Sequence, residues 1–286
     1  NFDIILQLGY TSSSIWHFLL PKKALVITNM DGLEWKRTKY SKSVQRVLLY
    51  AEKLAVKSSD YLISDSIGIQ KYLQTKYHKP SEYIAYGAHL FEQPDETVLS
   101  KYNVEAYNYH MILARLEPEN SIEIILDGVA QSRDGQAVLV IGNHNTAFGN
   151  YLKNKYKDCS KIRFIGAVYD INQLNNLRYF SNLYFHGHTV GGTNPSLLEA
   201  MASQALIVAH NNEFNAAILK ENAFYFTSAE DVNKILIETK KSDNLQKIAN
   251  NFEAIANEFN WEIINGKYAH FFEECFSKRR NGKTEL

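Results

Sequence analysis

One segment of the chain, residues 184–210, has the residue types and spacing of an anion-binding loop. Its pattern predicts a strand, a loop with glycines, a short helix and a buried strand, over residues 183–186, 187–194, 195–203 and 205–209. Asn194 is a favourable N-cap, and Pro195 suits the first helical position because its missing N–H costs nothing there. Gly192 lets the backbone approach a ligand, and the free N–H groups of the helix start favour phosphate. We therefore expect this loop to bind a phosphate group.

Glu199 lies inside the predicted helix, on the side opposite its apolar residues. Leu197, Leu198 and Met201 share the other side and should be buried, which leaves the Glu199 carboxylate accessible. A carboxylate in this place can accept hydrogen bonds from sugar hydroxyls. Alternatively, Glu199 only complements the positive end of the helix dipole.

Length and composition indicate a globular protein of about two domains. The formal net charge is zero, so there is no global attraction to nucleic acid, and any electrostatic function must be local. Cys159 and Cys275 are far apart in the sequence, which suggests neither a disulfide framework nor a zinc site and favours a reducing cytoplasm. No apolar run approaches the roughly 18 residues that span a bilayer. The chain opens with a strand pattern, so we expect no signal peptide.

Strands and helices alternate along the chain, which predicts an α/β fold with open parallel sheets that are covered on both faces. The clearest helix covers residues 41–58, where Val44, Leu48, Ala51 and Ala55 follow the spacing of an amphipathic helix. A polar stretch over residues 91–110 predicts a linker. Besides the two strands of the anion-binding segment, the candidate strands are residues 2–8, 24–28, 61–63, 83–85, 109–113, 137–141 and 162–165.

Three motifs together resemble a known enzyme family. The run NPSLLEAMAS, which contains Glu199, is similar to the second half of the E-x7-E signature of family 4 glycosyltransferases of the GT-B fold. DGLEWKR at residues 31–37 and ARLEPEN at residues 114–120 agree with the same family. Together with HGHTVGGTNP they resemble a bacterial rhamnosyltransferase-like subgroup that acts in surface polysaccharide assembly. The resemblance extends from about Phe2 to the region of Trp261.

The resemblance implies two Rossmann-like domains and a particular division of the chain. Residues 1–105 would form an acceptor-side N-terminal domain, residues 106–250 a nucleotide-sugar-binding domain, and residues 251–286 a helix that crosses back to the first domain. Measured against the family, the chain lacks the opening strand and glycine-rich loop of the first domain. We therefore expect an N-terminal domain that is incomplete in this sequence.

The same resemblance implies how a nucleotide-sugar donor would bind. Loop amides would bind its diphosphate, Glu199 its ribose, and the backbone near Val168 its base. The sequence departs from the family twice, because Gly191 replaces the first Glu of the signature and Asn120 replaces a phosphate-binding Lys. The expected donor-binding residues are Arg115, Val168, Gly192, Thr193, Asn194, Ser196 and Glu199.

Arg115 is the expected diphosphate cation. It follows the predicted strand 109–113, and ligands of open parallel sheets bind at the carboxyl ends of the strands. A guanidinium there can bind two phosphate oxygens at once. The alternative is a surface arginine that pairs with Glu117 or Glu119.

The acceptor is expected to bind near residues 31–57, which are rich in Lys and Arg. Asp31 and Glu34 follow the strand 24–28, so either can orient or deprotonate an acceptor hydroxyl, although Asp31 can instead be a turn former. Trp35 can pack on a sugar face. The cations favour anionic lipid or the pyrophosphate of a lipid-linked acceptor, or they form the solvated side of a helix. The expected residues of this acceptor or membrane side are Trp35, Lys36, Arg37 and Lys39.

The resemblance implies a retaining, metal-independent hexosyltransferase that works at the inner face of a bacterial membrane. Its partners would be a nucleotide-sugar donor, with dTDP-rhamnose as the best guess, and a lipid-linked saccharide acceptor, with no nucleic acid and no cofactor. His186 and His188 have no third ligand nearby in the sequence, so no metal site is expected. The rival hypotheses are a GT-B nucleotide-sugar epimerase and a non-catalytic nucleotide-sugar-binding half that needs a partner chain.

Overall fold

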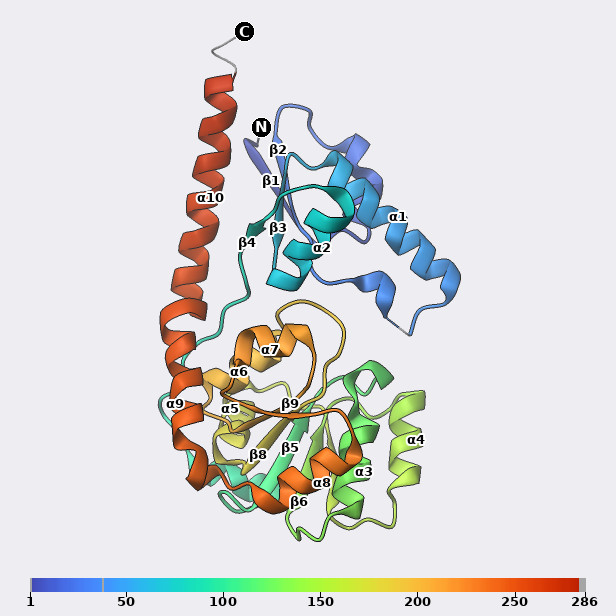
Figure 1. Ribbon diagram of the computed structural model, residues 1–286, viewed down its shortest axis with the longest axis vertical. Coiled ribbons are helices and arrows are strands. Elements are labelled where there is room, and N and C mark those ends of the chain that lie inside the picture. Colours follow the sequence, from blue (N-terminus) through green and yellow to red (C-terminus); the bar gives the residue numbers. More distant parts are fainter. Residues whose placement is uncertain (1, 38, 283–286) are drawn as a thin grey trace. The chain divides into compact units, whose positions relative to one another are not determined.

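A computed structural model describes residues 2–37 and 39–282, and the chain forms two compact units (Figure 1). Unit 1 consists of the described residues within 1–87, 190–193 and 261–286. Unit 2 consists of residues 88–189 and 194–260. Each unit contains one sheet whose paired strands are all parallel, which confirms the predicted α/β class.

The sheet of unit 1 has four strands in the order β1-β2-β3-β4. All five residues of β2 are buried, as expected for an inner strand of a parallel sheet. The predicted strand over residues 83–85 is shorter and begins earlier than expected. The strands are β1 (Ile4–Leu8), β2 (Leu25–Asn29), β3 (Tyr61–Ser64) and β4 (Glu82–Tyr83).

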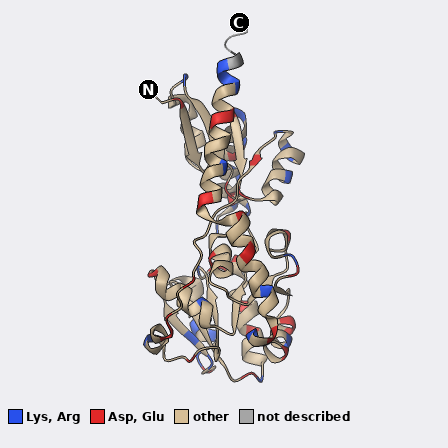
Figure 2. Ribbon diagram, turned by 90° about the vertical axis from the view of Figure 1, so that its left-hand side faces the viewer, with Lys and Arg blue, Asp and Glu red and all other residues tan. Residues whose placement is uncertain are grey.

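The two long helices that follow β2 and β3 in unit 1, α1 and α2, begin at serine caps. Ser41 accepts a hydrogen bond from the amide of Val44 at the start of α1, and Ser66 accepts one from Ile69 at the start of α2. Figure 2 shows charges of both signs along α10, with basic residues toward its C-terminal end. The helices are η1 (Ser13–Leu19), η2 (Glu34–Lys36), α1 (Lys42–Ser58), α2 (Ile67–Tyr77) and α10 (Trp261–Gly282), of which η1 and η2 are 3₁₀ helices.

The sheet of unit 2 has six strands in the order β10-β9-β8-β5-β6-β7. The chain therefore starts in the middle at β5, builds one half outward through β6 and β7, and then returns to build the other half from β8. This is the order of a doubly wound dinucleotide-binding fold. The strands are β5 (Tyr109–Leu113), β6 (Ala137–Ile141), β7 (Ile162–Gly166), β8 (Leu183–His186), β9 (Ile207–His210) and β10 (Phe224–Phe226).

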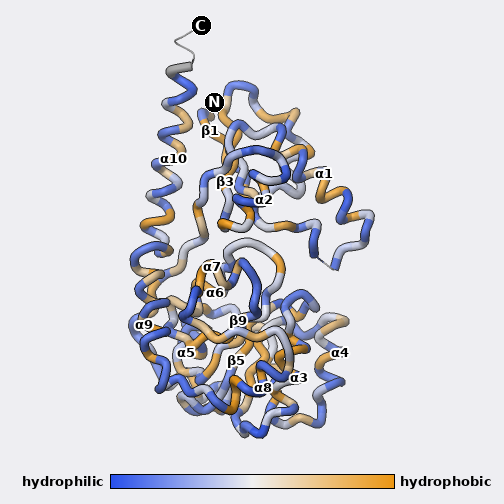
Figure 3. Tube along the Cα trace, in the orientation of Figure 1, coloured by the Kyte–Doolittle hydropathy of each residue, from blue (hydrophilic) through white to orange (hydrophobic). Residues whose placement is uncertain are grey.

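Apolar strands and helix faces form the core of unit 2, and Figure 3 shows hydrophobic residues concentrated on its inner strands. Ile112, Val140, Phe185 and Val208 come from four different strands and are all at most 1% exposed. Each fully buried side chain of this size contributes about 1.5–3 kcal/mol. The α-helices of unit 2 are α3 (Ile122–Gln131), α4 (Ala147–Lys155), α5 (Ile171–Phe180), α6 (Pro195–Ala202), α7 (Glu213–Leu219), α8 (Ala229–Glu238) and α9 (Leu245–Ala254).

The polar stretch expected to be a linker is instead packed on α5. It contains the 3₁₀ helix η3 (Glu96–Tyr102), whose Tyr102 hydroxyl donates to Gln173 at 2.7 Å. The amide of Asp95 donates to the Asn176 side chain at 2.6 Å. The polar composition therefore reflects hydrogen bonds to a neighbouring helix. Three short helical segments complete unit 2, namely η4 (Pro118–Asn120), η5 (Lys241–Asn244) and the π-helical η6 (Ile255–Phe259).

Candidate functional site

The strand order of unit 2 defines one place where a ligand fits best. β5 pairs with β8 in parallel, and the chain leaves these two neighbours toward opposite halves of the sheet. At such a switch point the connections after the two strands diverge, and ligands bind outside the carboxyl ends. Arg115 follows β5, while the loop that begins at Gly187 follows β8. Two motifs that are about 70 residues apart in the sequence therefore meet at one edge.

The loops after β5 and β8 are in direct contact. Thr189 donates from its amide and from its hydroxyl to the carbonyl of Glu119, at 3.1 and 2.7 Å. A Cβ at Gly187 would lie 2.1 Å from the carbonyl oxygen of Asn120, so only glycine allows this approach. The Asn120 side chain in turn donates to the carbonyl of Arg115 at 2.7 Å. Asn120 thus closes the loop after β5, which explains a short amide where the resembling family has a lysine.

The start of α6 has the predicted cap. Asn194 Oδ1 accepts hydrogen bonds from the amide and the hydroxyl of Ser196, both at 2.9 Å, and Pro195 occupies the first helical position. The amides of Leu197 and Leu198 both donate to the carbonyl of Asn194, so the attraction of this helix start for an anion comes from the helix dipole. Arg115 is exposed at the end of β5. Val168 is half-buried in the loop that follows β7. These residues all lie at the carboxyl edge of one sheet.

Glu199 forms an ion pair that sequence reasoning did not find. Its Oε2 atom is 2.5 Å from Nη2 of Arg178, which lies in α5 and is fully buried. The Glu199 side chain is 35% exposed. Arg178 carries no sequence signal, because its partner is 21 residues away and an arginine near a helix C-terminus is ordinarily a surface residue. The helix-dipole hypothesis for Glu199 is therefore incomplete, since the carboxylate also neutralises a buried cation.

Three aromatic rings are stacked on one another near Arg178. The ring of His186 stacks on that of Tyr184, with centroids 6.4 Å apart, and on that of His188 at 4.4 Å. Burial lowers the pKa of His186 well below its usual value, and the nearby charges of His188 and Arg178 act in the same direction. Among the described residues, no group of three His, Cys, Asp or Glu side chains is placed to bind a metal ion.

The ion pair gives a first prediction. Glu199→Gln should lower the free energy of unfolding by about 1–3 kcal/mol, because it leaves the Arg178 guanidinium buried without a counter-charge. This is less than the roughly 3–5 kcal/mol of a fully buried pair, since the carboxylate end is partly solvated. Urea unfolding of this variant is compared with Glu238→Gln, an exposed residue at the end of α8. Equal stability of the Glu199 variant and the parent would show that the pair is energetically neutral.

Unit 1 presents a second set of polar residues, one after each of its strands. Tyr10 follows β1, Asp31 follows β2, Asp65 follows β3 and Tyr86 follows β4. The register pairs Asn29 with Ile63, and continued for two residues it places Asp31 opposite Asp65. The amide of Met30 donates to the carbonyl of Ile63 at 2.8 Å, which shows that the pairing continues beyond the strand bounds. Asp31 is thus at a carboxyl edge, as predicted.

Asp65 is the member of this set that sequence reasoning missed. It is 1% exposed, and neither carboxylate oxygen has a hydrogen bond of ordinary geometry. Burial and the charge of Asp31 raise its pKa to about 8. Gly192 and Thr193, two of the expected donor-binding residues, belong to unit 1 by their contacts. Thr193 donates to the carbonyl of Asp65 at 2.6 Å, and a Cβ on Gly192 would lie 1.9 Å from a carboxylate oxygen of Asp65.

Asp31 and Glu34 have different surroundings. The pKa of Asp31 is raised, mainly because the surrounding protein displaces water from the carboxylate and also because Glu34 is nearby. Glu34 is engaged with Arg37, at 2.7 Å from Nη2. The backbone amide of Glu34 donates to the Tyr10 hydroxyl at 3.1 Å. Of the two candidate catalytic carboxylates, Glu34 is therefore held in an ion pair, and Asp31 is the better candidate for contact with an acceptor hydroxyl.

Trp35 takes part in a buried cluster around Glu52, which weakens its expected role on a sugar face. Its Nε1 donates to Glu52 at 2.9 Å. Glu52 is 1% exposed, although the sequence predicts the solvated side of a helix for its neighbours. It also accepts hydrogen bonds from three further side chains, at 2.6–3.0 Å, namely Tyr72, Tyr77 and Lys76. The indole N–H is thus used within unit 1.

Two of the three cations on the expected acceptor or membrane side, Lys36 and Lys39, are exposed. Lys36 lies over the ring of Trp35 at 5.6 Å and Lys39 over that of Tyr40 at 5.1 Å, which are cation–π contacts. Arg37 is half-buried and paired with Glu34, as described above. Lys36 and Lys39 are therefore the members of this group with positive charge available at the surface.

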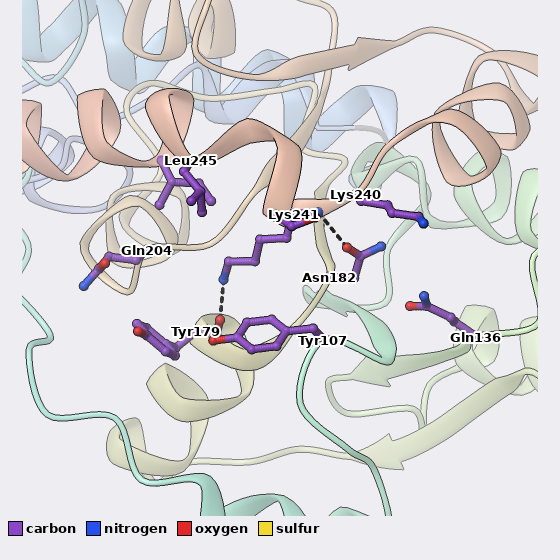
Figure 4. A pocket seen from close by; sticks show the side chains of 10 residues that line it. Tyr107, Gln136, Tyr179, Asn182, Gln204, Lys240, Lys241 and Leu245 are labelled. Carbon is purple, nitrogen blue, oxygen red and sulfur yellow. Dashed lines mark hydrogen bonds between the residues drawn. The ribbon is translucent and has the colours of Figure 1, made fainter.

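Unit 2 also contains a cavity of about 460 Å³ that is remote from the switch point (Figure 4). It lies at the opposite, amino edge of the sheet, because Tyr107, Gln136 and Asn182 precede β5, β6 and β8. Lys241 extends along it with its ammonium near the rings of Tyr107 and Tyr179, and donates to the carbonyl of Tyr179. That carbonyl is in the last turn of α5, so Lys241 satisfies a helix C-terminus. Burial lowers the pKa of Lys241 to about 7.

The lowered pKa of Lys241 gives a second prediction. The unfolded chain holds this proton up to a pKa of about 10.4, whereas the folded chain releases it near 7. The unfolded state therefore binds more protons between these values, so the free energy of unfolding contributed by Lys241 rises with pH across this window. Between pH 7 and pH 9 the free energy of unfolding should increase by about 2 kcal/mol more for the parent than for Lys241→Met. Urea unfolding of both proteins at both pH values measures this difference. A constant difference between the two proteins would contradict the assigned pKa.

Comparisons with known proteins agree with the fold. A family model described as a domain of unknown function, DUF1972, matches residues 15–89. Among proteins with curated functions, none matches the sequence. No helix of the described residues combines the length and apolar composition needed to cross a membrane.

Solved structures place the chain in the GT-B fold of glycosyltransferases. HepE of Anabaena, in complex with UDP and glucose, has a TM-score of 0.79 at 17% identity and covers 95% of this chain and 77% of that chain. Sucrose-phosphate synthase of Thermosynechococcus elongatus has a TM-score of 0.81 at 17% identity, and the match covers 96% of this chain and 74% of the synthase chain. A glycosyltransferase from Rickettsia africae has a TM-score of 0.73 at 15% identity, and the match covers 96% of this chain and 76% of the Rickettsia chain.

Proposed function

We propose that this protein is a glycosyltransferase that takes a sugar from a nucleotide diphosphate donor. The observation that carries the proposal is the switch point of unit 2. There a diphosphate has a cation available from Arg115 after β5, and the positive end of the α6 helix dipole after β8. Glu199, one turn further along α6, offers an acceptor for sugar hydroxyls. The structural similarity to HepE, which was crystallised with UDP and glucose, supports the same type of ligand.

The chemistry expected of such a site is positioning and charge stabilisation. Breaking the bond between sugar and diphosphate places negative charge on the leaving phosphate, and a guanidinium together with the positive end of a helix dipole stabilises that charge. This set of groups needs no metal to do so, in line with a metal-independent reaction. In unit 1, Asp31 follows β2 at the carboxyl edge of the sheet, and its carboxylate orients or deprotonates the acceptor hydroxyl.

The finer assignment rests on the sequence motifs. Their resemblance to the rhamnosyltransferase-like subgroup supports L-rhamnose from dTDP-rhamnose as the transferred sugar, with retention of configuration. It also supports a lipid-linked saccharide as acceptor, in bacterial surface polysaccharide synthesis at the cytoplasmic face of the membrane. A GT-B epimerase would need no lipid acceptor, and a non-catalytic nucleotide-sugar-binding half would need a partner chain for turnover. Transfer by the isolated chain distinguishes the proposal from both.

The surface of unit 1 supports the membrane side of the proposal. From Ser13 to Lys57 there are nine Lys and Arg residues against three acids, in a chain of zero formal net charge. Two of those acids, Glu34 and Glu52, are already paired. Trp16, Phe18 and Leu19 of η1 are exposed, and η1 packs against α1. α1 in turn exposes three apolar side chains among its cations, namely Val44, Val47 and Tyr50. Apolar and basic side chains on one surface suit an anionic bilayer interface.

The donor proposal predicts stabilisation by nucleoside diphosphates. A ligand at 100 times its Kd adds about 2.7 kcal/mol to the free energy of unfolding, so the melting temperature should rise. Thermal denaturation with dTDP, UDP, GDP and ADP ranks the bases. Arg115→Ala should reduce the shift, because it removes a charge-assisted contact to phosphate worth about 1.5–3 kcal/mol, whereas the exposed Arg133→Ala should not. If none of the four nucleotides shifts the folded protein, the donor proposal is wrong.

The membrane proposal predicts a salt-dependent loss of binding when charges are removed. Replacing Lys42, Arg46 and Lys53 of α1 by Gln should weaken binding to vesicles with anionic lipid by about 1 kcal/mol per charge. The effect should shrink as ionic strength rises. The control replaces three exposed lysines of unit 2 by Gln, namely Lys101, Lys157 and Lys234, and is measured in the same vesicle sedimentation assay. Equal loss in both triple variants would mean that α1 is an ordinary solvated surface.

A further inference from the structure

Arg178 is held in place from two sides inside unit 2. Its Nη2 atom donates to Glu199 at 2.5 Å, and its Nη1 atom donates to the side chain of Asn175 at 2.8 Å. The hydroxyl of Ser203 donates to the same oxygen of Asn175 at 3.1 Å, and also to the carbonyl of Glu199 at 2.7 Å. Asn175 and Arg178 belong to α5, and Glu199 to α6. The contacts therefore form a closed network between two neighbouring helices.

The pair is asymmetric in its exposure. The Arg178 side chain is fully buried, whereas that of Glu199 is 35% exposed. Only Oε2 of Glu199 is used, and in the described part of the chain no side chain donates to Oε1. A buried guanidinium without a counter-charge is costly, so the carboxylate has a strong reason to stay beside it. Glu199 thus loses its rotamer freedom when the protein folds, and not when a ligand binds.

The chemistry of the pair selects the group that it can recognise. The two charges cancel, and the cation is inaccessible, so the exposed end does not attract phosphate. What it offers is a carboxylate oxygen, which needs a hydrogen-bond donor. Glu199 is four residues past Pro195, or about 6 Å along the helix axis at 1.5 Å per residue. A neutral hydroxyl group attached close to a diphosphate fits this place, and a nucleotide has such a group on its ribose.

We propose that Arg178 is a positioning residue that fixes Glu199, so that the carboxylate accepts hydrogen bonds from the ribose hydroxyls of the nucleotide. This inference rests on the proposed function, because it assumes that a nucleotide binds at the switch point. It adds that discrimination for the ribose depends on a residue of α5 that does not contact the ligand. Arg178 is accordingly a specificity determinant through Glu199.

The test compares a nucleoside diphosphate with an analogue that lacks the ribose hydroxyls. Isothermal titration calorimetry measures the Kd of UDP and of 2′,3′-dideoxy-UDP. If a different nucleotide binds best in the thermal screen, it is paired with its own deoxy analogue. The parent should bind the hydroxyl-bearing form at least 10-fold more tightly, as expected for a hydrogen bond to a charged group. Glu199→Gln and Arg178→Gln should both bring the ratio of Kd values close to 1. Arg178→Lys, which keeps the charge without the planar fork, should give an intermediate ratio.

A matched control and a milder variant make the outcome decisive. Arg163→Gln removes another arginine of unit 2 that donates to the carbonyls of Tyr102 and Asn103, and it should keep the parent's ratio. A folded Arg178→Gln protein with the full ratio overturns the inference while leaving the nucleotide site intact. If Arg178→Gln does not fold, Asn175→Ala replaces it, and there an unchanged ratio overturns the inference in the same way. Absence of binding of every nucleotide to the parent refutes the proposed function itself.

Discussion

Parallel pairing of β5 with β8 in the middle of the six-stranded sheet is the constraint on which the site of unit 2 depends. Each parallel connection crosses over a face of the sheet, and here the chain builds one half outward from β5 and then returns to β8 to build the other half. The two central strands then end side by side with diverging loops. Arg115 and the start of α6 are neighbours for that reason, and Gly187 is required where the two loops touch. The strand order thus creates the place to which the proposed function assigns the nucleotide diphosphate.

Buried charge is the second common feature, and in each case a local partner explains it. Glu52 accepts four side-chain hydrogen bonds, and Arg178 has Glu199 and Asn175. Lys241 has a helix-terminal carbonyl and two aromatic rings. Two of these groups stabilise unit 1 or unit 2 without reaching an exposed surface. The Arg178–Glu199 and Glu52–Lys76 pairs each present one charged end to solvent, at 35% exposure, and of the two it is the Glu199 end that lies beside the switch point of unit 2, which makes it the candidate for ligand recognition.

The carboxyl edge of the small sheet in unit 1 collects groups that share protons or hydrogen bonds. Asp31 and Asp65 occupy equivalent register positions, and the pKa of each is raised. Tyr86 interacts with Asp31, and its own pKa is raised by burial and by the two carboxylates. α10 contributes Tyr268, whose hydroxyl accepts a hydrogen bond from Asn29 at 3.2 Å. Such an edge suits proton transfer to or from an acceptor hydroxyl, whereas the edge of unit 2 suits an anion.

The sequence by itself determined the α/β class, most strand positions and the capped start of α6, because these depend on local pattern. Apolar runs, the Asn194 cap and Pro195 act within a few residues, so their signal is contiguous. It did not reveal β10, which has only three residues, or the packing of residues 91–110 on α5. Tertiary structure alone decided the partners of Glu52, Glu199 and Asp65, because charges that meet across 20 or more residues leave no periodic trace. Whether a charged side chain is solvated or buried in a pair is set by which elements pack together, and that is a property of the folded chain.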